Sequence, residues 1–196
     1  SIEHFDLIVH PGDAIEVADS EVEHNVDVLK TPPITLLESN EMLTREHAKR
    51  RLNLPMGATV TYVQLGAGQI NDIASEIRRT IDALLEHENM HVVLGESMLG
   101  ERLPILKERV HLLRDYPNAL YFKAFDFSVQ AGGYNSFHEM RIMGIPTLFY
   151  PNMETGMDDQ KARCEIAISE GWGLVTMIGN KTTITKDINT LIQYCL

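Results

Sequence analysis

The chain has 196 residues, of which 17 are Lys or Arg and 28 are Asp or Glu, giving a formal net charge of −11. With 44% hydrophobic residues it can bury the core of one large domain or two small ones, whereas its acidic balance argues against a nucleic-acid footprint or a polybasic membrane patch. The two cysteines, Cys164 and Cys195, fit neither a disulfide framework nor a metal-binding pattern. This cysteine usage leads us to expect a reducing, cytoplasmic setting, and no apolar run approaches the roughly 20 residues of a membrane span.

The N-terminal part contains one predicted strand, an irregular stretch and one predicted helix. The apolar residues 5–10 predict a buried strand that ends at the turn Pro11-Gly12-Asp13. The acidic segment 14–33 has no regular period, and we interpret it as a linker. Thr44 is typical of a helix N-cap and predicts a short helix over 44–52.

From residue 59 onward, predicted strands and helices alternate. We expect strands at 59–65, 91–95, 110–113, 125–129, 147–151 and 173–177, with a further extended piece at 119–123. Helices are expected at 73–88 and 103–108, after the glycines at 132–133, at about 158–170 and at 186–194. This alternation predicts an α/β fold with a doubly wound, Rossmann-like parallel sheet and helices on both faces.

The segment 130–139 has the features of an anion-binding turn. Two adjacent glycines, Gly132 and Gly133, follow an apolar strand and precede a helix. The first N–H groups of a helix have no internal acceptor and lie at the positive end of the helix dipole, so they bind phosphate well. Asn135 or Ser136 can cap this helix or bind a phosphate oxygen, and Glu139 can accept hydrogen bonds from ribose hydroxyls. The alternative is a capped helix after a glycine turn, without a ligand.

Two further polar groups follow other predicted strands. Gly66-x-Gly68 comes after 59–65, but it lacks the third glycine and the later acidic residue of a dinucleotide site, and no P-loop Gly-Lys-Ser/Thr is present. Asp159 and Gln160 open the helix after 147–151. Because the carboxyl ends of parallel strands meet at one edge, these groups together can bind phosphate, ribose and another hydroxylated group.

A longer series of residues combines these groups: Gly133-Tyr134-Asn135-Ser136-x-x-Glu139, Gly144-x-Pro146, Pro151 and Asp159-Gln160. It resembles the donor-binding signature of the GT-B nucleotide-sugar glycosyltransferases. The plant and animal UDP-sugar transferases carry a similar series, and the bacterial peptidoglycan N-acetylglucosaminyltransferase carries a looser one. The resemblance spans about residues 57–180 and implies one half of a GT-B fold, the C-terminal donor-binding domain.

The resemblance implies a role for each matching position. The diphosphate is expected at the 132–136 turn with residues 66–69 closing over it, the ribose at Glu139, the sugar at 159–160, and the base near 112–117. The expected donor-binding residues are Gly66, Ala67, Gly68, Gln69, Arg114, Gly132, Gly133, Asn135, Ser136, Glu139, Asp159 and Gln160.

This sequence departs from the plant signature in three places. Ala131 stands where a histidine approaches the phosphate, so more phosphate stabilisation is expected from the backbone, the helix dipole or Arg114. Tyr134 stands for a tryptophan. The Trp-x-Pro-Gln that stacks on uracil in the plant enzymes has no visible counterpart.

The implied activity is the metal-independent, inverting transfer of a sugar from a UDP-sugar or another NDP-sugar to an unknown acceptor, without a cofactor. The general base is expected in an N-terminal acceptor domain. Residues 1–35 are interpreted as the end of that domain and the interdomain linker, and residues 36–196 as the donor domain. Because the chain opens on Ser1 without an initiator Met, we expect a fragment that binds donor but does not turn over alone. Its partners are then the donor, the acceptor and its own N-terminal domain, through which any membrane contact would be made, and not nucleic acid.

Three other functions remain open from the sequence. The chain could be the catalytic subunit of a split glycosyltransferase, which the linker-like first 35 residues argue against. A non-hydrolysing UDP-N-acetylglucosamine 2-epimerase shares the expected fold and ligand. A nucleotide-sugar sensor without enzymatic activity would keep the binding residues and lose transfer.

Overall fold

The computed structural model of the chain describes residues 4–15, 26–65, 73–95, 107–153, 158–176 and 181–195. The predicted glycine turn at 66–72 lies outside these residues, as do most of the predicted helix at 103–108 and the end of the predicted strand at 173–177. Within the described residues, no helix combines the length and the apolar character needed to cross a membrane.

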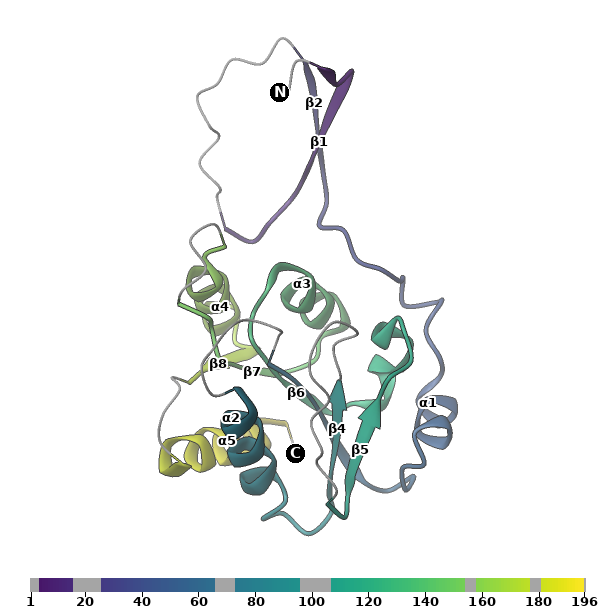
Figure 1. Cartoon of the computed structure of the whole chain (residues 1–196), viewed down its shortest axis with the longest axis vertical. Coiled ribbons are helices and arrows are strands. Elements are labelled where there is room, and N and C mark those ends of the chain that lie inside the picture. Colours follow the sequence, from purple (N-terminus) through teal and green to yellow (C-terminus); the bar gives the residue numbers. More distant parts are fainter. Residues whose placement is uncertain are drawn as a thin grey trace.

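Six parallel strands form the central sheet, in the order β5-β4-β3-β6-β7-β8 (Figure 1). This order confirms the predicted doubly wound sheet, because it reverses direction between β3 and β6. The bounds of the strands are β3 Thr59–Gln64, β4 Met90–Gly95, β5 Val110–Leu113, β6 Phe127–Gln130, β7 Thr147–Phe149 and β8 Gly173–Val175.

Helices cover both faces of this sheet (Figure 1). One face packs against α2 (Ile73–Leu84) and α5 (Lys181–Cys195), the latter beginning earlier than predicted. The other face packs against four shorter helices, which are α1 (Arg45–Arg51), the 3-10 helix η2 (Asn118–Ala124), α3 (Tyr134–Met143) and α4 (Gln160–Ser169). Thr44 caps α1 as predicted, since its hydroxyl accepts the N–H of His47 at 3.3 Å.

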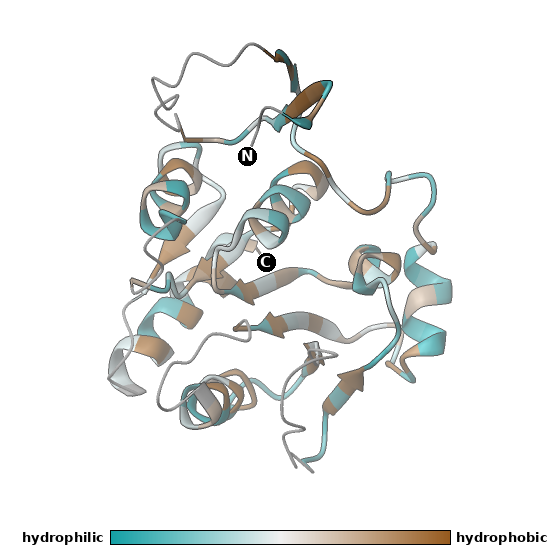
Figure 2. Ribbon diagram, turned by 45° about the horizontal axis from the view of Figure 1, so that its top comes forward, coloured by the Kyte–Doolittle hydropathy of each residue, from teal (hydrophilic) through white to brown (hydrophobic). Residues whose placement is uncertain are grey.

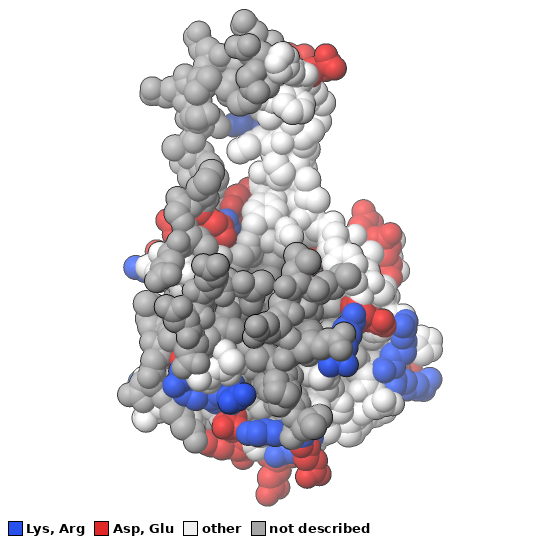
Figure 3. All heavy atoms as spheres, viewed as in Figure 1, with Lys and Arg blue, Asp and Glu red and all other residues white. Residues whose placement is uncertain are grey.

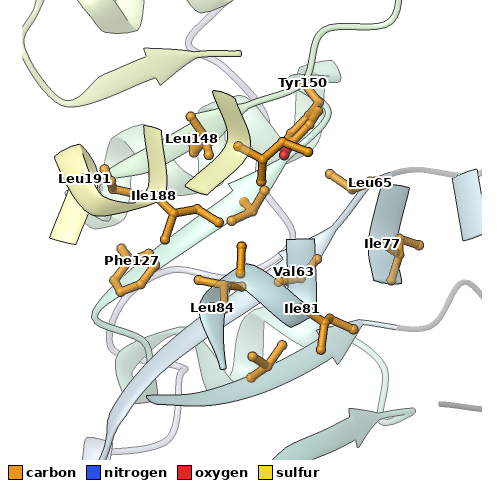
Figure 4. Packing of buried hydrophobic residues seen from close by; sticks show 14 of the residues in the cluster. Val63, Leu65, Ile77, Ile81, Leu84, Phe127, Leu148, Tyr150, Ile188 and Leu191 are labelled. Carbon is orange, nitrogen blue, oxygen red and sulfur yellow. The ribbon is translucent and has the colours of Figure 1, made fainter. Parts of the chain in front are cut away.

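The hydrophobic core lies on both sides of the sheet, because successive strand residues point to opposite faces. Val63 and Phe127 face α2 and α5, which contribute Ile81 and Ile188 (Figure 4). Tyr62 points to the opposite face and packs against η2, where its ring lies 5.5 Å from that of Phe122. In Figure 2 hydrophobic residues recur along the central strands, as expected for strands that are buried on both faces.

The prediction of an extended piece at 119–123 is wrong, because this segment lies inside the 3-10 helix η2. Pro117 precedes the helix as its N-cap. The buried residues Ala119 and Phe122 are three positions apart, as are Tyr121 and Ala124, and this spacing matches the turn of a 3-10 helix. The short apolar run therefore packs as a helix and not as a strand.

The segment interpreted as a linker contains a strand that the sequence analysis missed. Strand β2 (Asp27–Thr31) pairs in parallel with β1 (Leu7–Pro11), forming a small sheet apart from the central one (Figure 1). The side chains of Val9 and Leu29 are about half exposed, at 48% and 50%. The strand pair β1–β2 carries hydrophobic residues (Figure 2). On the face shown in Figure 3 its described atoms are mainly uncharged, whereas Lys, Arg, Asp and Glu side chains mix on the lower part of the molecule.

Candidate functional site

The carboxyl ends of β3 and β6 lie side by side at the point where the strand order reverses. Gln64 of β3 is the register partner of Gln130 of β6. From β3 the sheet continues to β4 on one side, and from β6 it continues to β7 on the other. In doubly wound sheets the ligand crevice opens outside the carboxyl ends of the strands at this switch point. The residues that follow these two strands therefore form the candidate site.

The turn after β6 contains two glycines that are needed for different reasons. Gly132 has a φ of +83°, and a Cβ there would collide with Sγ of Cys164 and lie 3.5 Å from Cδ1 of Phe149. Gly133 has a φ of −61°, and a Cβ there would meet only Nε2 of Gln160, at 3.9 Å. The fold therefore requires Gly132, whereas Gly133 leaves the space next to the backbone open for a ligand.

Helix α3 begins directly after this turn, with Gly133 as its N-cap and without a side-chain hydrogen bond at the cap. Of the two roles expected for Asn135 or Ser136, the helix cap is wrong, because both residues lie inside the first turn, and the contact with a phosphate oxygen stays a prediction. Asn135 is exposed and Ser136 is half-buried. First-turn N–H groups and the helix dipole attract anions, so this end of α3 can bind a phosphate.

A buried amide that the sequence analysis missed lies next to the glycine turn. Gln130 has no exposed surface, and neither polar atom of its side chain has a hydrogen-bond partner among the described residues. An unpaired buried amide costs roughly 1–3 kcal/mol, so a polar ligand that reached Gln130 would gain free energy. The available signal in the sequence was a glutamine in the last position before the glycine turn.

Glu139 lies in α3 and contacts the chain that leads into the central domain. Its carboxylate accepts the backbone N–H of Leu36, while its Oε1 is buried and has no hydrogen-bond partner in the described part of the chain. Burial raises the pKa of Glu139 to about 7, although the hydrogen bond from Leu36 opposes the shift. A buried carboxyl with a raised pKa and an unused oxygen is a common feature of functional sites. Its predicted contact with ribose stays a prediction.

The two residues predicted to bind the sugar lie at the start of α4. Asp159 is exposed and is the N-cap, since its Oδ1 accepts the N–H of Ala162 at 2.9 Å. Gln160 is buried, and a hydrogen bond of 3.0 Å joins its Oε1 to the N–H of Asn152. Its Nε2 donates to Oδ2 of Asp158 at 3.1 Å. Gln160 thus holds the loop before α4, and Asp159 is the more accessible of the two; their contact with a sugar stays a prediction.

The structure separates Arg114 from the glycine turn. Arg114 is exposed and follows β5, which is the third strand from β6 along the sheet. At about 4.8 Å between neighbouring strands, the two strand ends are roughly 14 Å apart. Arg114 therefore lies far from the glycine turn, and its predicted contact with a phosphate or a base stays a prediction. The predicted contacts of Gly66, Ala67, Gly68 and Gln69 lie outside the described residues.

The fold is similar to that of several solved glycosyltransferase structures. The spinosyn forosaminyltransferase SpnP matches with a TM-score of 0.61 and 13% identity over 86% of this chain. The glycosyltransferase VinC in complex with DTDP matches with a TM-score of 0.58 and 15% identity over 84% of this chain. The glycotransferase of kitacinnamycin matches with a TM-score of 0.57 and 20% identity over 70% of this chain. These matches confirm the predicted fold, a Rossmann-like half of the GT-B type.

The chain corresponds to less than half of each of these proteins. It spans 42% of the forosaminyltransferase, 43% of VinC and 35% of the kitacinnamycin enzyme. No protein-family model matches the chain, and no curated protein matches it in sequence.

Proposed function

We propose that this chain is the donor-binding part of a glycosyltransferase that moves a sugar from a nucleoside diphosphate to an acceptor. The observation that carries the proposal is the composition of segment 130–139 at the switch point of the sheet. There the uncapped first turn of α3, the unpaired amide of Gln130 and the unpaired Oε1 of Glu139 all have unused hydrogen-bonding capacity among the described residues. Backbone amides suit a diphosphate, and a carboxylate suits a hydroxylated sugar.

The proposed chemistry is the stabilisation of charge on the leaving diphosphate. As the bond between the sugar and the diphosphate breaks, negative charge grows on the phosphate oxygens. The N–H groups after Gly133 are held by the helix before the reaction, so they stabilise this charge without reorganising. Transfer that inverts the sugar and needs no metal ion belongs to this proposal. The general base would come from the acceptor domain, outside residues 36–196.

The half-exposed apolar side chains of β1 and β2 support the proposed division of the chain. Leu7 and Val9 of β1 are each 48% exposed, and Val28 and Leu29 of β2 are each 50% exposed. A small sheet of this kind is marginal alone and is more stable when a larger body covers it. We therefore assign this pair to the acceptor side of the proposed enzyme and residues 36–196 to the donor side.

The nucleotide of the donor is proposed to be UDP or thymidine diphosphate. The UDP assignment comes from the sequence resemblance. The thymidine assignment is suggested by structural neighbours that were solved with the nucleotide bound, the spinosyn rhamnosyltransferase SpnG with thymidine diphosphate and VinC with DTDP. The two bases differ by one methyl group, so both nucleotides belong in the first binding experiment.

Calorimetry with UDP, thymidine diphosphate, UDP-glucose and UDP-N-acetylglucosamine tests the proposal directly. We expect the wild-type chain to bind at least one of these ligands and Glu139→Ala to bind it about tenfold or more weakly, since a charged hydrogen bond is worth roughly 1.5–3 kcal/mol. The matched control is Glu170→Gln, which removes a carboxylate at the C-cap of α4, at the other end of that helix from Asp159. Failure of every nucleotide to bind, or equal affinity of wild type and Glu139→Ala, would refute the proposal.

A further inference from the structure

A buried ionic cluster joins the N-terminal segment to helices α3 and α4. Asp13 accepts two hydrogen bonds from the guanidinium of Arg163, from Nε to Oδ1 at 3.0 Å and from Nη2 to Oδ2 at 2.7 Å. Nε2 of His138 lies 3.0 Å from the same Oδ1, and the N–H of Ala14 donates to it at 2.6 Å. The side chains of Asp13, His138 and Arg163 are only 8%, 1% and 3% exposed.

Arg163 also holds the glycine turn of the candidate site. Its Nη1 donates to the carbonyl oxygen of Gly132 at 3.1 Å, and its Nη2 lies 2.8 Å from Oδ1 of Asp158. One guanidinium therefore bridges the N-terminal segment, the turn after β6 and the loop before α4. Such a planar group with several fixed donors can hold three acceptors in one geometry.

Tyr134, the first residue of α3, ties the same two regions together. Its hydroxyl donates to the carbonyl oxygen of Gly12 at 2.8 Å and accepts the N–H of Ile34 at 3.3 Å. The guanidinium of Arg163 lies 5.8 Å from the centre of the Tyr134 ring, within the range of a cation–π contact. The segment that follows β1 and the segment that follows β2 thus both attach to the first residue of the helix after the glycine turn.

The charge states of the cluster are set by its burial and its hydrogen bonds. Burial alone would raise the pKa of Asp13, but the hydrogen bonds from Arg163 and His138 outweigh it and lower the pKa to about 2. Burial lowers the pKa of His138 more than Asp13 raises it, so the imidazole is neutral at neutral pH and donates through Nε2. Asp13 and Arg163 therefore form a permanent ion pair around neutral pH.

We propose that Arg163 is a positioning residue for the glycine turn, which is the proposed diphosphate site. We propose further that Asp13 couples this turn to Gly12–Ala14, the segment that packs against α3 and α4 and is called the docked segment below. The orientation of the Gly132 carbonyl fixes the peptide plane that leads into Gly133, and this plane sets the direction in which α3 begins. Without the Asp13–Arg163 ion pair, Arg163 no longer fixes the carbonyl of Gly132. The first-turn N–H groups of α3 are then no longer held in the orientation that binds one phosphate. The ligand part of this inference rests on the proposed function.

Coupling of this kind acts in both directions. If the docked segment stabilises the turn in the geometry that binds a diphosphate, then a bound diphosphate must stabilise the docked segment by the same free energy. The effect is specific to the phosphate part of the ligand, because the cluster contacts the turn at Gly132 and makes no described contact with residues near 112–117.

Amide hydrogen exchange of the ligand-free chain tests the positioning role without any nucleotide. We expect Asp13→Asn and Arg163→Met to increase exchange by about tenfold at Phe137, whose N–H donates to the carbonyl oxygen of Gly133 at 2.9 Å, as a local opening of the turn requires. The matched control is Glu170→Gln, which removes an ion pair with Arg141 that joins α3 and α4 at their other ends. Unchanged exchange at Phe137 in Asp13→Asn, the variant that best preserves shape, would overturn the inference even if Arg163→Met does not fold.

Titrations with UDP and with uridine then test the coupling. In Asp13→Asn we expect UDP affinity to fall at least about fivefold while uridine affinity stays unchanged, and we expect UDP to slow exchange at residues 12–14 in the wild-type chain. Equal losses for UDP and uridine would indicate a general structural defect and would overturn the coupling. Absence of UDP and thymidine diphosphate binding to the wild type would refute the proposed function, while the exchange comparison still decides the positioning role.

Discussion

Leu36 donates its backbone N–H to the carboxylate of Glu139, and this contact places a buried acid between the chain that enters the domain and the helix of the glycine turn. The pKa of Glu139 is raised from its ordinary value of 4.5 to about 7 by burial. The folded chain therefore holds this proton more tightly than the unfolded chain does. The free energy of unfolding therefore decreases as the pH rises from about 4.5 to 7, and the whole of this loss of stability is present above pH 7.

Glu139→Gln is accordingly expected to stabilise the chain at pH 8 and to have little effect at pH 5. A shift of this size corresponds to about 3 kcal/mol, of which the unpaired amide of the glutamine removes part, so we expect a net gain of about 2 kcal/mol. Denaturant unfolding of wild type and variant at both pH values measures it. A difference between the two proteins that is the same at pH 5 and pH 8 would contradict the raised pKa.

Nucleotide affinity is expected to rise with pH between 6 and 8 if Glu139 binds the ribose. Only the ionised carboxylate accepts hydrogen bonds from both hydroxyls, and binding then releases the proton that Glu139 holds below its pKa of about 7. Calorimetry with UDP in buffers of different ionisation enthalpy measures this proton release. Glu139→Gln is the control, because it keeps the pH dependence of the UDP phosphate itself and loses that of the carboxyl.

Alanine at the two adjacent glycines is expected to give opposite outcomes. Gly132→Ala forces a methyl group onto Sγ of Cys164 at a φ of +83°, so we expect a loss of stability of about 2–4 kcal/mol or failure to fold. Gly133→Ala meets only Nε2 of Gln160 at 3.9 Å, so the fold should lose no more than about 1 kcal/mol at the N-cap.

The same pair separates fold from function in a binding experiment. Gly133→Ala places a methyl group where the diphosphate is proposed to approach, so we expect folded protein with at least about tenfold weaker UDP binding. Thermal unfolding and calorimetry on one preparation give both values. Wild-type affinity in Gly133→Ala would place the diphosphate elsewhere.

Gln130→Leu is expected to stabilise the ligand-free chain and to weaken nucleotide binding. The leucine removes two buried polar groups that have no partner among the described residues, so the free energy of unfolding should rise by about 1–2 kcal/mol. UDP affinity should fall about tenfold if a ligand supplies those partners. These two effects are measured by denaturant unfolding and by calorimetry.

Ser128→Ala on the same face of β6 is the matched control for that variant. Oγ of Ser128 is hydrogen-bonded to Oγ1 of Thr147 at 2.6 Å, so its removal should cost about 1 kcal/mol and leave UDP affinity unchanged. A Gln130→Leu variant that loses stability like Ser128→Ala would show that the amide is paired in solution.

Much of the fold could be predicted from short-range patterns along the chain. Alternating strands and helices predicted the parallel sheet, Thr44 predicted the start of α1, and the paired glycines predicted the turn after β6. These features depend on the side-chain period of each element and on local backbone chemistry, which a few neighbouring residues contain. The assignment of residues 1–35 to another domain stays a prediction.

Other features of the site depend on residues that meet only after folding. Asp13 and Arg163 are 150 positions apart, and only the folded chain brings the N-terminal segment to Arg163, whose guanidinium also donates to the carbonyl of Gly132. Likewise, the raised pKa of Glu139 and the unpaired amide of Gln130 follow from what buries them, and burial is a property of the packed chain. The glycine turn could therefore be identified from its own residues, whereas the groups that hold it and the groups that it leaves unpaired could not, because distant elements supply them.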